Sequence, residues 1–429
     1  MNRREFVKKT LGSFVLANAS GSLVQLNAKS NRQIASTHLS ELKSPLAIAM
    51  WDFSWLLRHY QGGGFEDWDI VLDQLVERGY NAIRIDCFPH LVAAGKDGQI
   101  KEEFYFPKKD WKPVSWGNGA SIYAKPRQGL LEFIPKCHER GIYISLSTWF
   151  RADDSHRNHQ VKSLAEFVRV WKETLGFLNE HGLLKNVIFV DILNEYPFWH
   201  GFSWLHNEIK KRGAQNEQDI NDKDENEKHL QNFNTSKYNN AQINFYRDFA
   251  TDTIKQLKNS YPLFDYTASL SYHGQVDWQD MDFNQFDLID MHIWFIHNGK
   301  LSNPTGFWNM KKENDLKFRQ VNAAIKKVWR ESKPEFINWM DAELRKIALA
   351  GKKYNIPYGC TEGWGPLGWL EHPNLDWDWV KETGEIAVKL AKKHGYSFIC
   401  TSNYNQPQFP GVWNDIKWHQ KLTSIIKQA

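Results

Sequence analysis

Short apolar segments rich in β-branched residues recur along the chain, and most of them are followed by a segment with helical periodicity. An alternation of this kind predicts parallel strands joined by helical crossovers. Several of the segments are almost continuously apolar, as expected of strands that are covered on both faces. The eight predicted strands are Leu46–Trp51, Ala82–Asp86, Ile142–Thr148, Val187–Leu193, Phe264–Ser271, Leu288–Trp294, Pro357–Thr361 and Ser397–Ser402.

The segments between these strands carry apolar residues at helical spacing, and several end at a glycine, which is a common helix cap. Eight strands in this rhythm favour a (β/α)8 TIM barrel, an α/β fold built as a single domain with loop insertions. An open doubly wound sheet is the alternative, but no glycine-rich phosphate loop follows the first strand. The predicted helices are Phe65–Arg78, Gln128–Arg140, Val161–His181, Asn244–Ser260, Pro334–Lys353, Asp376–His394 and Trp413–Lys427.

Two stretches interrupt the alternation. Residues 87–127 form a long connection after the second strand and are rich in aromatic residues and proline. We expect them to contribute an active-site loop, because the loops that follow barrel strands build the site. Residues 207–240 are almost purely polar, which predicts a mobile surface insertion.

The first 28 residues have the features of an export signal: a basic start, a short apolar stretch and then small residues. Their pattern Arg-Arg-x-Phe-x-Lys resembles a twin-arginine signal. This resemblance implies a signal peptide at residues 1–28, a linker at 29–44, the barrel at 45–429 and a periplasmic or extracellular location. A disordered basic tail is the alternative. The residues that carry the pattern are Arg3, Arg4, Phe6 and Lys8.

The composition excludes several classes of protein. Hydrophobic residues make up 41% of the chain, and no apolar run reaches the ~18 residues that a membrane-spanning helix needs. The net charge is +4, of which the predicted signal peptide contributes +3, so nucleic acid is not expected as a partner. The four cysteines are widely spaced and form no CxxC pair, so we expect no metal and no cofactor. The oligomeric state cannot be deduced from the sequence.

Two glutamates follow predicted strands: Glu195 comes after the fourth strand and Glu362 after the seventh. Catalytic groups of a barrel sit at the carboxyl ends of its strands, and strands four and seven lie on opposite sides. The two carboxyl groups can therefore face each other across the mouth of the barrel. This arrangement suits cleavage of a glycosidic bond, which uses a pair of carboxyl groups. For either glutamate alone, a surface position at a helix N-terminus is the alternative.

The sequences around these glutamates resemble the signature of glycoside hydrolase clan A, and most closely the cellulase-type family 5. The resemblance rests on Asn194-Glu195 after the fourth strand and on Glu362 after the seventh, and it spans most of residues 45–415. It implies that Glu195 is the acid/base and Glu362 the nucleophile. It also implies that Asn194 hydrogen-bonds the 2-hydroxyl group of the sugar.

Further positions match this family, and two depart from it. Arg84 resembles the arginine of the second strand that supports the nucleophile, and His292 resembles the histidine of the sixth strand. Trp294 stands where the family usually has a tyrosine that hydrogen-bonds the nucleophile, so that support is absent or comes from elsewhere. The third strand ends at Ser147-Thr148-Trp149, where a histidine is usual.

Tryptophan is unusually frequent, with 20 residues in the chain. Sugars present flat CH faces that stack on aromatic rings, so tryptophans at the mouth of a barrel are candidates for a sugar cleft. Tryptophans within predicted helices are expected to pack against the barrel instead. The predicted substrate-binding residues, besides Asn194, Arg84 and His292, are Trp51, Trp149, Trp294, Trp364 and Asn403.

Together these features predict a retaining glycoside hydrolase that cleaves β-linked oligo- or polysaccharide of the β-glucan or β-mannan type. In this hypothesis the two glutamates act by double displacement, and the expected partner is a carbohydrate substrate. The alternative is a weak or inactive carbohydrate-binding barrel of the cellulase-like kind, which the altered third and sixth strands favour. Retention of both glutamates favours the enzyme.

Overall fold

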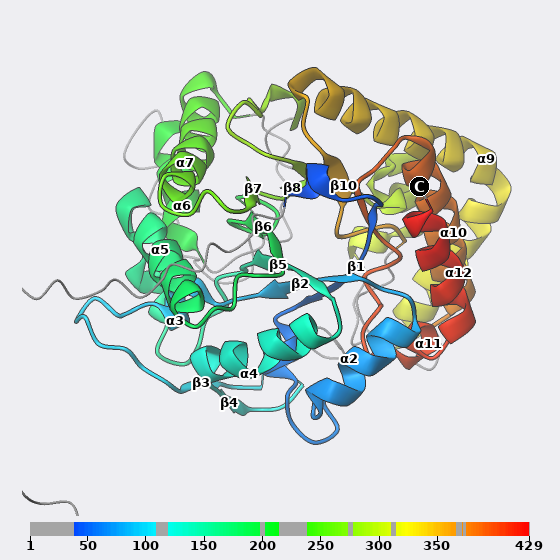
Figure 1. The fold of residues 1–429 in the computed structure, drawn as a ribbon. Coiled ribbons are helices and arrows are strands. Elements are labelled where there is room, and N and C mark those ends of the chain that lie inside the picture. Colours follow the sequence, from blue (N-terminus) through cyan, green and yellow to red (C-terminus); the bar gives the residue numbers. More distant parts are fainter. Residues whose placement is uncertain are drawn as a thin grey trace, which may run out of the picture. The chain divides into compact units, whose positions relative to one another are not determined.

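Nine strand segments form one sheet at the centre of the computed structural model, and helices surround it (Figure 1). The structure describes residues 38–108, 119–197, 202–213, 238–272, 278–309, 315–365, 371 and 375–428. Residues 35–429 group into one compact unit. The predicted signal peptide lies outside the described residues, as does the part of the predicted linker before His38.

The strands pair in parallel and in the order β7-β6-β5-β2-β1-β11-β10-β9-β8. The first and last members of this order are consecutive in the chain, so the sheet closes on itself. The prediction of an α/β barrel is therefore confirmed. The strands are β1 (Leu46–Asp52), β2 (Ala82–Asp86), β5 (Tyr143–Ser147), β6 (Val187–Asp191), β7 (Asp265–Thr267), β8 (Leu270–Ser271), β9 (Ile289–His292), β10 (Tyr358–Cys360) and β11 (Phe398–Cys400).

The fifth strand of the barrel differs from the single predicted segment, because β7 and β8 are separated by Ala268 and Ser269. The interruption has a local cause. The backbone N–H of Ser269 donates to the side chain of Asp191 at 2.8 Å instead of joining the ladder, and the Ser269 hydroxyl donates to the same carboxylate. One half of the strand then pairs with β6 and the other half with β9.

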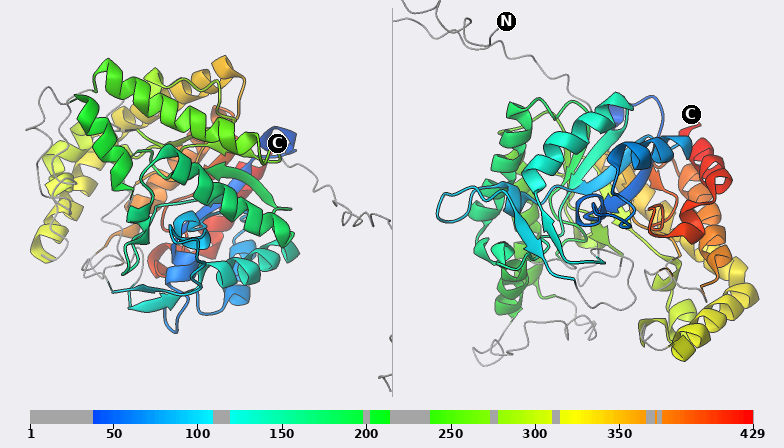
Figure 2. Two further views of the ribbon diagram at one scale, coloured as in Figure 1. Left: turned by 90° about the vertical axis from the view of Figure 1, so that its left-hand side faces the viewer. Right: turned by 90° about the horizontal axis from the view of Figure 1, so that it is seen from below.

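Helices cover the outside of the sheet (Figures 1 and 2). Side chains cap the amino ends of several of them, as Asp67 does for α2 and Ser163 for α5. Glycines with positive φ follow several carboxyl ends, as predicted. The helices are α1 (Ser54–Leu57), α2 (Trp68–Glu77), α3 (Pro89–Val92), α4 (Pro126–Glu139), α5 (Leu164–Glu180), α6 (Ser203–Gly213), α7 (Asn240–Lys258), α8 (Gly299–Thr305), α9 (Asp315–Tyr354), α10 (Trp377–Lys393), α11 (Pro410–Trp413) and α12 (Ile416–Lys427).

One predicted boundary was wrong. Helix α9 begins at Asp315 rather than at Pro334, because the chain bends at Ser332 (φ −128°) and continues as a helix on both sides of the bend. The first residues of the predicted polar insertion belong to α6, which continues to Gly213. The remainder of that insertion up to residue 237 lies outside the described residues.

The long connection after β2 contains α3 and a two-stranded antiparallel hairpin, β3 (Phe104–Phe106) and β4 (Ile122–Ala124). Phe104 and Phe106 are buried, so one face of this hairpin packs against the molecule. The backbone N–H of Asp154 donates to the carbonyl of Tyr105 and ties the hairpin to the loop that follows β5. Residues 109–118 of the connection lie outside the described residues.

Buried side chains fill the barrel and the layer between strands and helices. Trp171, Trp329, Trp379 and Trp418 are buried on helices, as predicted for packing residues, whereas Trp339, predicted to do the same, is half-buried. The four cysteines are all buried and unpaired. Among the described helices, none combines the length and the apolar character that a bilayer crossing needs.

Gly359 in β10 packs against β11 so closely that a side chain does not fit. A Cβ atom at this position would lie 2.4 Å from the backbone oxygen of Phe398 and 2.4 Å from its Cδ2. We expect Gly359→Ala to lower the free energy of unfolding by roughly 1–3 kcal/mol, because the two strands must move apart. Urea unfolding measures this change, and a loss below about 0.5 kcal/mol would contradict the packing described.

Candidate active site

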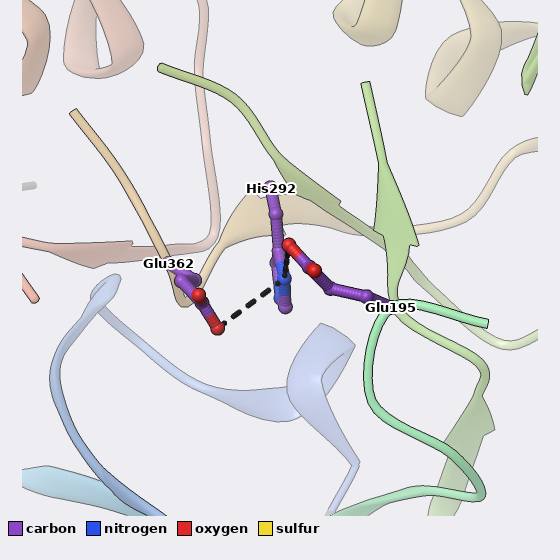
Figure 3. Close-up of side chains that lie close together, drawn as sticks. All are labelled: Glu195, His292 and Glu362. Carbon is purple, nitrogen blue, oxygen red and sulfur yellow. Dashed lines mark hydrogen bonds and ion pairs between the residues drawn. The ribbon is translucent and has the colours of Figure 1, made fainter. Parts of the chain in front are cut away.

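Four predicted site residues from different parts of the barrel meet at the carboxyl ends of its strands. Arg84 lies in β2, His292 is the last residue of β9, Glu195 follows β6 and Glu362 follows β10. One carboxylate oxygen of each glutamate and one ring nitrogen of His292 all lie within 4.8 Å of one another. Figure 3 shows the two carboxyl groups converging on the imidazole from opposite sides.

The backbone around Glu195 is held in an unusual conformation. Its φ is 46°, in the left-handed region that residues other than glycine rarely adopt. The backbone N–H of Glu195 donates to the hydroxyl of Ser269 at 2.9 Å, and that hydroxyl is itself held by Asp191. The interruption of the fifth strand therefore positions Glu195. Strained backbone of this kind is found most often at functional sites.

Arg84 is completely buried and connects most of the charged groups of the site. Its Nη2 donates to Oε2 of Glu362 at 2.9 Å and to Oδ2 of Asp52 at 3.0 Å. Its Nε donates to Oδ1 of Asp52 at 2.9 Å, and its Nη1 donates to the hydroxyl of Thr361 at 2.8 Å. Because a guanidinium is planar and always charged, these contacts fix both its orientation and its field.

The two ring nitrogens of His292 face different groups: Nε2 faces Arg84, and Nδ1 faces Glu195. Its Nε2 lies 2.9 Å from Nη1 of Arg84 and 3.1 Å from the hydroxyl of Thr361. Burial opposes protonation of the ring, but the charge of Glu362 and hydrogen bonds to Asp290 and Glu195 raise the pKa of His292 to about 10, so Nδ1 carries a proton. Nδ1 then donates to Oε1 of Glu195 at 3.2 Å, and it lies 3.4 Å from Oε2 of Glu362. The histidine thereby places one N–H between the two carboxyl groups.

Glu362 is buried close to Glu195, and this changes its titration. Burial raises the pKa of Glu362 to about 8, and Glu195 contributes in the same direction, while His292 and Arg84 oppose the shift. Arg84 contacts Glu362 and not Glu195, so its positive charge favours the ionised form of Glu362.

Glu195, His292 and Glu362 have the donor types of a metal site, but their hydrogen bonds favour proton transfer. Nδ1 of His292 carries a proton and offers no lone pair to an ion. Oε2 of Glu362 already accepts from the Arg84 cation, which would repel a divalent ion at that position. The donor set therefore fits an acid/base pair better than a metal centre.

Most of the predicted aromatic residues are buried at this end of the barrel. Trp51 and Trp364 have no exposed surface, and their Nε1 atoms donate to the backbone carbonyls of Asn405 and Cys400. Trp294 is also buried, at 3% exposure. Trp51 and Trp364 therefore pack in the barrel, and Trp294 keeps a small exposed area comparable to that of Glu362. Trp149 is part-exposed, and its Nε1 donates to Oδ2 of Asp52 at 2.8 Å.

Two buried amides next to the glutamates have unused hydrogen-bonding atoms. Both side-chain polar atoms of Asn194 lack a hydrogen-bond partner. The side-chain oxygen of Asn403 accepts from the backbone N–H of Gly363 at 2.9 Å, which leaves its Nδ2 without a partner. A buried polar group without a partner costs about 1–3 kcal/mol, so such groups mark positions where a ligand can supply the missing bond.

The sequence reasoning missed the carboxylates that support the site. Asp52 binds Arg84, Asp191 holds Ser269, and Asp290 accepts from the backbone N–H and the hydroxyl of Thr361. Burial raises the pKa of Asp191, although Arg84 opposes this shift. All three aspartates are completely buried. The sequence did contain a signal for these aspartates: each is a charged residue within an apolar strand, and a buried charge needs a buried partner.

Comparison with known proteins assigns this chain to a family. The profile of the sugar-binding cellulase-like family matches residues 48–427, which is most of the chain. The chain belongs to the sugar-binding cellulase-like family. This confirms the predicted relationship to cellulase-type glycoside hydrolases. A search of curated proteins found no match.

Solved structures are similar to this cellulase-like chain over most of its length. One is the crystal structure of a candidate glycoside hydrolase from Parabacteroides distasonis, with a TM-score of 0.74, 29% identity, and coverage of 90% of this chain and 94% of that one. Another is the endo-β-1,4-mannanase from Thermotoga petrophila, with a TM-score of 0.48, 9% identity, and coverage of 91% and 79%. The comparisons support a glycosidase.

Proposed function

We propose that the protein is a retaining glycosidase that cleaves β-linked oligo- or polysaccharide of the β-glucan or β-mannan type. The observation that carries this proposal is the proximity of Glu195 and Glu362, whose nearest oxygens lie within 4.8 Å. Retaining enzymes hold their two carboxyl groups about 5–5.5 Å apart, whereas inverting enzymes separate them by about 6.5–9.5 Å to admit a water molecule. The geometry therefore favours double displacement.

In the first step, the protonated carboxyl group of Glu195 donates its proton to the glycosidic oxygen as the C–O bond breaks. The ionised carboxylate of Glu362 attacks the anomeric carbon and forms a glycosyl ester. Arg84 favours the charged form of Glu362 through the 2.9 Å contact of Nη2, as the resemblance to family 5 implies for this arginine.

In the second step, the carboxylate of Glu195 removes a proton from water, and the resulting hydroxide attacks the anomeric carbon and releases Glu362. The Nδ1–H of His292 lies between both carboxyl groups and stabilises whichever one carries the negative charge. We assign the unpaired amide of Asn194 to the sugar 2-hydroxyl and the free Nδ2 of Asn403 to another hydroxyl of the same sugar.

The part-exposed ring of Trp149 is the candidate for stacking against a sugar face. We also propose export through the twin-arginine route, on the strength of Arg3, Arg4, Phe6 and Lys8, and hence a periplasmic or extracellular site of action. A polymeric substrate is consistent with such a location, because polysaccharides do not enter the cell intact.

A panel of polysaccharides and aryl β-glycosides tests the proposed activity. The protein should release reducing sugar or aryl alcohol from at least one β-glucan, β-mannan or corresponding aryl glycoside. Isothermal titration with the same glycans provides the second measurement. Binding without any release would contradict the hydrolase and would favour the carbohydrate-binding barrel.

The titration of Glu362 predicts the pH dependence of the reaction. Burial raises the pKa of Glu362 to about 8, and the proposed nucleophile must be ionised to attack the anomeric carbon. We therefore expect kcat/KM to rise as the pH rises through about 8. A profile that stays flat from pH 6 to 9.5 would contradict this titration of Glu362.

A further inference from the structure

Asp52 is a buried aspartate that has no role in the proposed mechanism. It lies beside Arg84 and Trp149, which do have roles in it. Asp52 ends β1 and has no exposed surface. Both of its oxygens accept from Arg84, at 2.9 and 3.0 Å, and Oδ2 also accepts from Nε1 of Trp149 at 2.8 Å. Its backbone has a positive φ of 42°, so the chain turns sharply to present this carboxylate.

One nitrogen of Arg84 links Asp52 to the proposed nucleophile. Nη2 donates one hydrogen to Oδ2 of Asp52 and the other to Oε2 of Glu362. The two carboxylates therefore compete for the same positive charge. If the Asp52 charge is removed, the guanidinium loses one of its competing carboxylates and stabilises the Glu362 anion more strongly, which makes Glu362 a weaker nucleophile.

The same oxygen of Asp52 that accepts from Arg84 also fixes the ring of Trp149. Phe53 also contacts this ring in a T-shaped arrangement, with the ring centroids 5.5 Å apart. Trp149 is the part-exposed tryptophan that we assign to sugar stacking, so a ligand on that ring presses on a side chain bonded to Asp52. Movement of the indole and orientation of the guanidinium are thus connected through one carboxylate.

We propose that Asp52 is a positioning residue that balances the charge of Arg84 against Glu362 and couples this balance to the sugar-contacting ring of Trp149. This inference rests on the proposed glycosidase activity and assigns a further residue to it. Asp52 touches neither the sugar nor the reacting atoms; it acts through Arg84 and Trp149.

The obvious variant is Asp52→Asn, which keeps the shape of the side chain and removes its charge. An amide has one acceptor oxygen, whereas the site presents donors from Arg84 Nε, Arg84 Nη2 and Trp149 Nε1, so at least one of these bonds is lost. Misplacement of catalytic groups by such a change costs up to roughly 10²-fold in rate. We expect kcat to fall by about 10- to 100-fold and KM to rise.

The pH profile separates a positioning role from a purely structural one. The negative charge of Asp52 raises the pKa of Glu362, so its removal should move the rise of kcat/KM to lower pH. Asp52→Glu, which keeps the charge, should return the rise toward the wild-type pH. The charged and titratable groups that face Glu362 or the Arg84 contact are Asp52, Arg84, Glu195, Asp191, Asp290 and His292.

Asp86 provides a matched control. It ends β2, is completely buried, and accepts from the backbone N–H groups of Trp149 and Phe88 at 2.8 and 2.7 Å. No hydrogen bond joins it to Arg84 among the described contacts. Burial raises the pKa of Asp86 to about 7, and Asp52 acts in the same direction. Asp86→Asn therefore disturbs the same loop and should lower the melting temperature, while the step of the pH profile that belongs to Glu362 stays in place.

The decisive experiment compares wild type, Asp52→Asn, Asp52→Glu and Asp86→Asn in kcat, KM and kcat/KM from pH 4 to 10, with melting temperatures. A folded Asp52→Asn whose pH profile matches wild type would overturn the proposal. If wild type itself hydrolyses nothing, the glycosidase fails, and the titration of Glu362 followed by carboxyl ¹³C NMR replaces the kinetic readout. An unchanged Glu362 titration in Asp52→Asn would then overturn the charge balance by itself.

Discussion

Glu362→Gln should lower kcat by roughly 10⁴-fold or more on every substrate that the wild type cleaves, which is the usual scale for loss of a nucleophile. The amide oxygen can still accept from Arg84 Nη2, so the variant keeps the size and one hydrogen bond of the original. It cannot form the glycosyl ester. Initial rates with an aryl glycoside measure the loss, and thermal unfolding shows that the variant is folded.

Glu343→Gln is a suitable control for that substitution. Glu343 is also a buried glutamate, but it lies on α9 and pairs with Lys346 at 2.8 Å, away from the strand ends. It should retain the wild-type rate. A Glu362→Gln protein that hydrolyses glycosides within tenfold of wild type would show that another group is the nucleophile.

Arg84→Met should produce the largest loss of stability among the substitutions considered. Methionine fills much of the volume of arginine but leaves the carboxylates of Asp52 and Glu362 buried without their cation. Removing one partner of a buried ion pair typically costs about 3–5 kcal/mol. We therefore expect the free energy of unfolding in urea to fall by that amount, and activity to fall with it.

Arg84→Lys distinguishes loss of charge from loss of geometry. Lysine keeps a positive charge but lacks the planar fork that bonds Asp52 through both oxygens and still reaches Glu362. It should recover part of the stability lost in Arg84→Met while remaining impaired in kcat. An Arg84→Met protein whose unfolding free energy lies within about 1 kcal/mol of wild type would contradict the central place of this guanidinium.

The barrel could be predicted from sequence because its strands are buried on both faces and stand out as short apolar runs between helical segments. Glu195 and Glu362 could be found because both directly follow such runs. The break between β7 and β8 could not be predicted, since it depends on Asp191 capturing the backbone of Ser269. That contact spans 78 residues and exists only once the sheet has curled.

The orientation of the aromatic side chains could not be predicted from the sequence either. A position at a strand end predicts proximity to the mouth of the barrel, but it does not distinguish a ring that faces a cleft from one that packs beneath it. Trp51 and Trp364 are buried and bonded to backbone carbonyls, whereas Trp149 remains part-exposed. The carboxylate of Asp52 was overlooked because its partner, Arg84, lies on the neighbouring strand in a register that the sequence does not specify.

Covalent trapping tests the two-glutamate mechanism most directly. A 2-deoxy-2-fluoro β-glycoside with a good leaving group slows hydrolysis of the glycosyl ester more than its formation, because the fluorine destabilises the positive charge that develops on the sugar. Intact-mass measurement should show one added fluoroglycosyl group, and peptide mapping should place it on Glu362. Attachment to a different residue, or turnover that yields product of inverted configuration without any adduct, would contradict the mechanism.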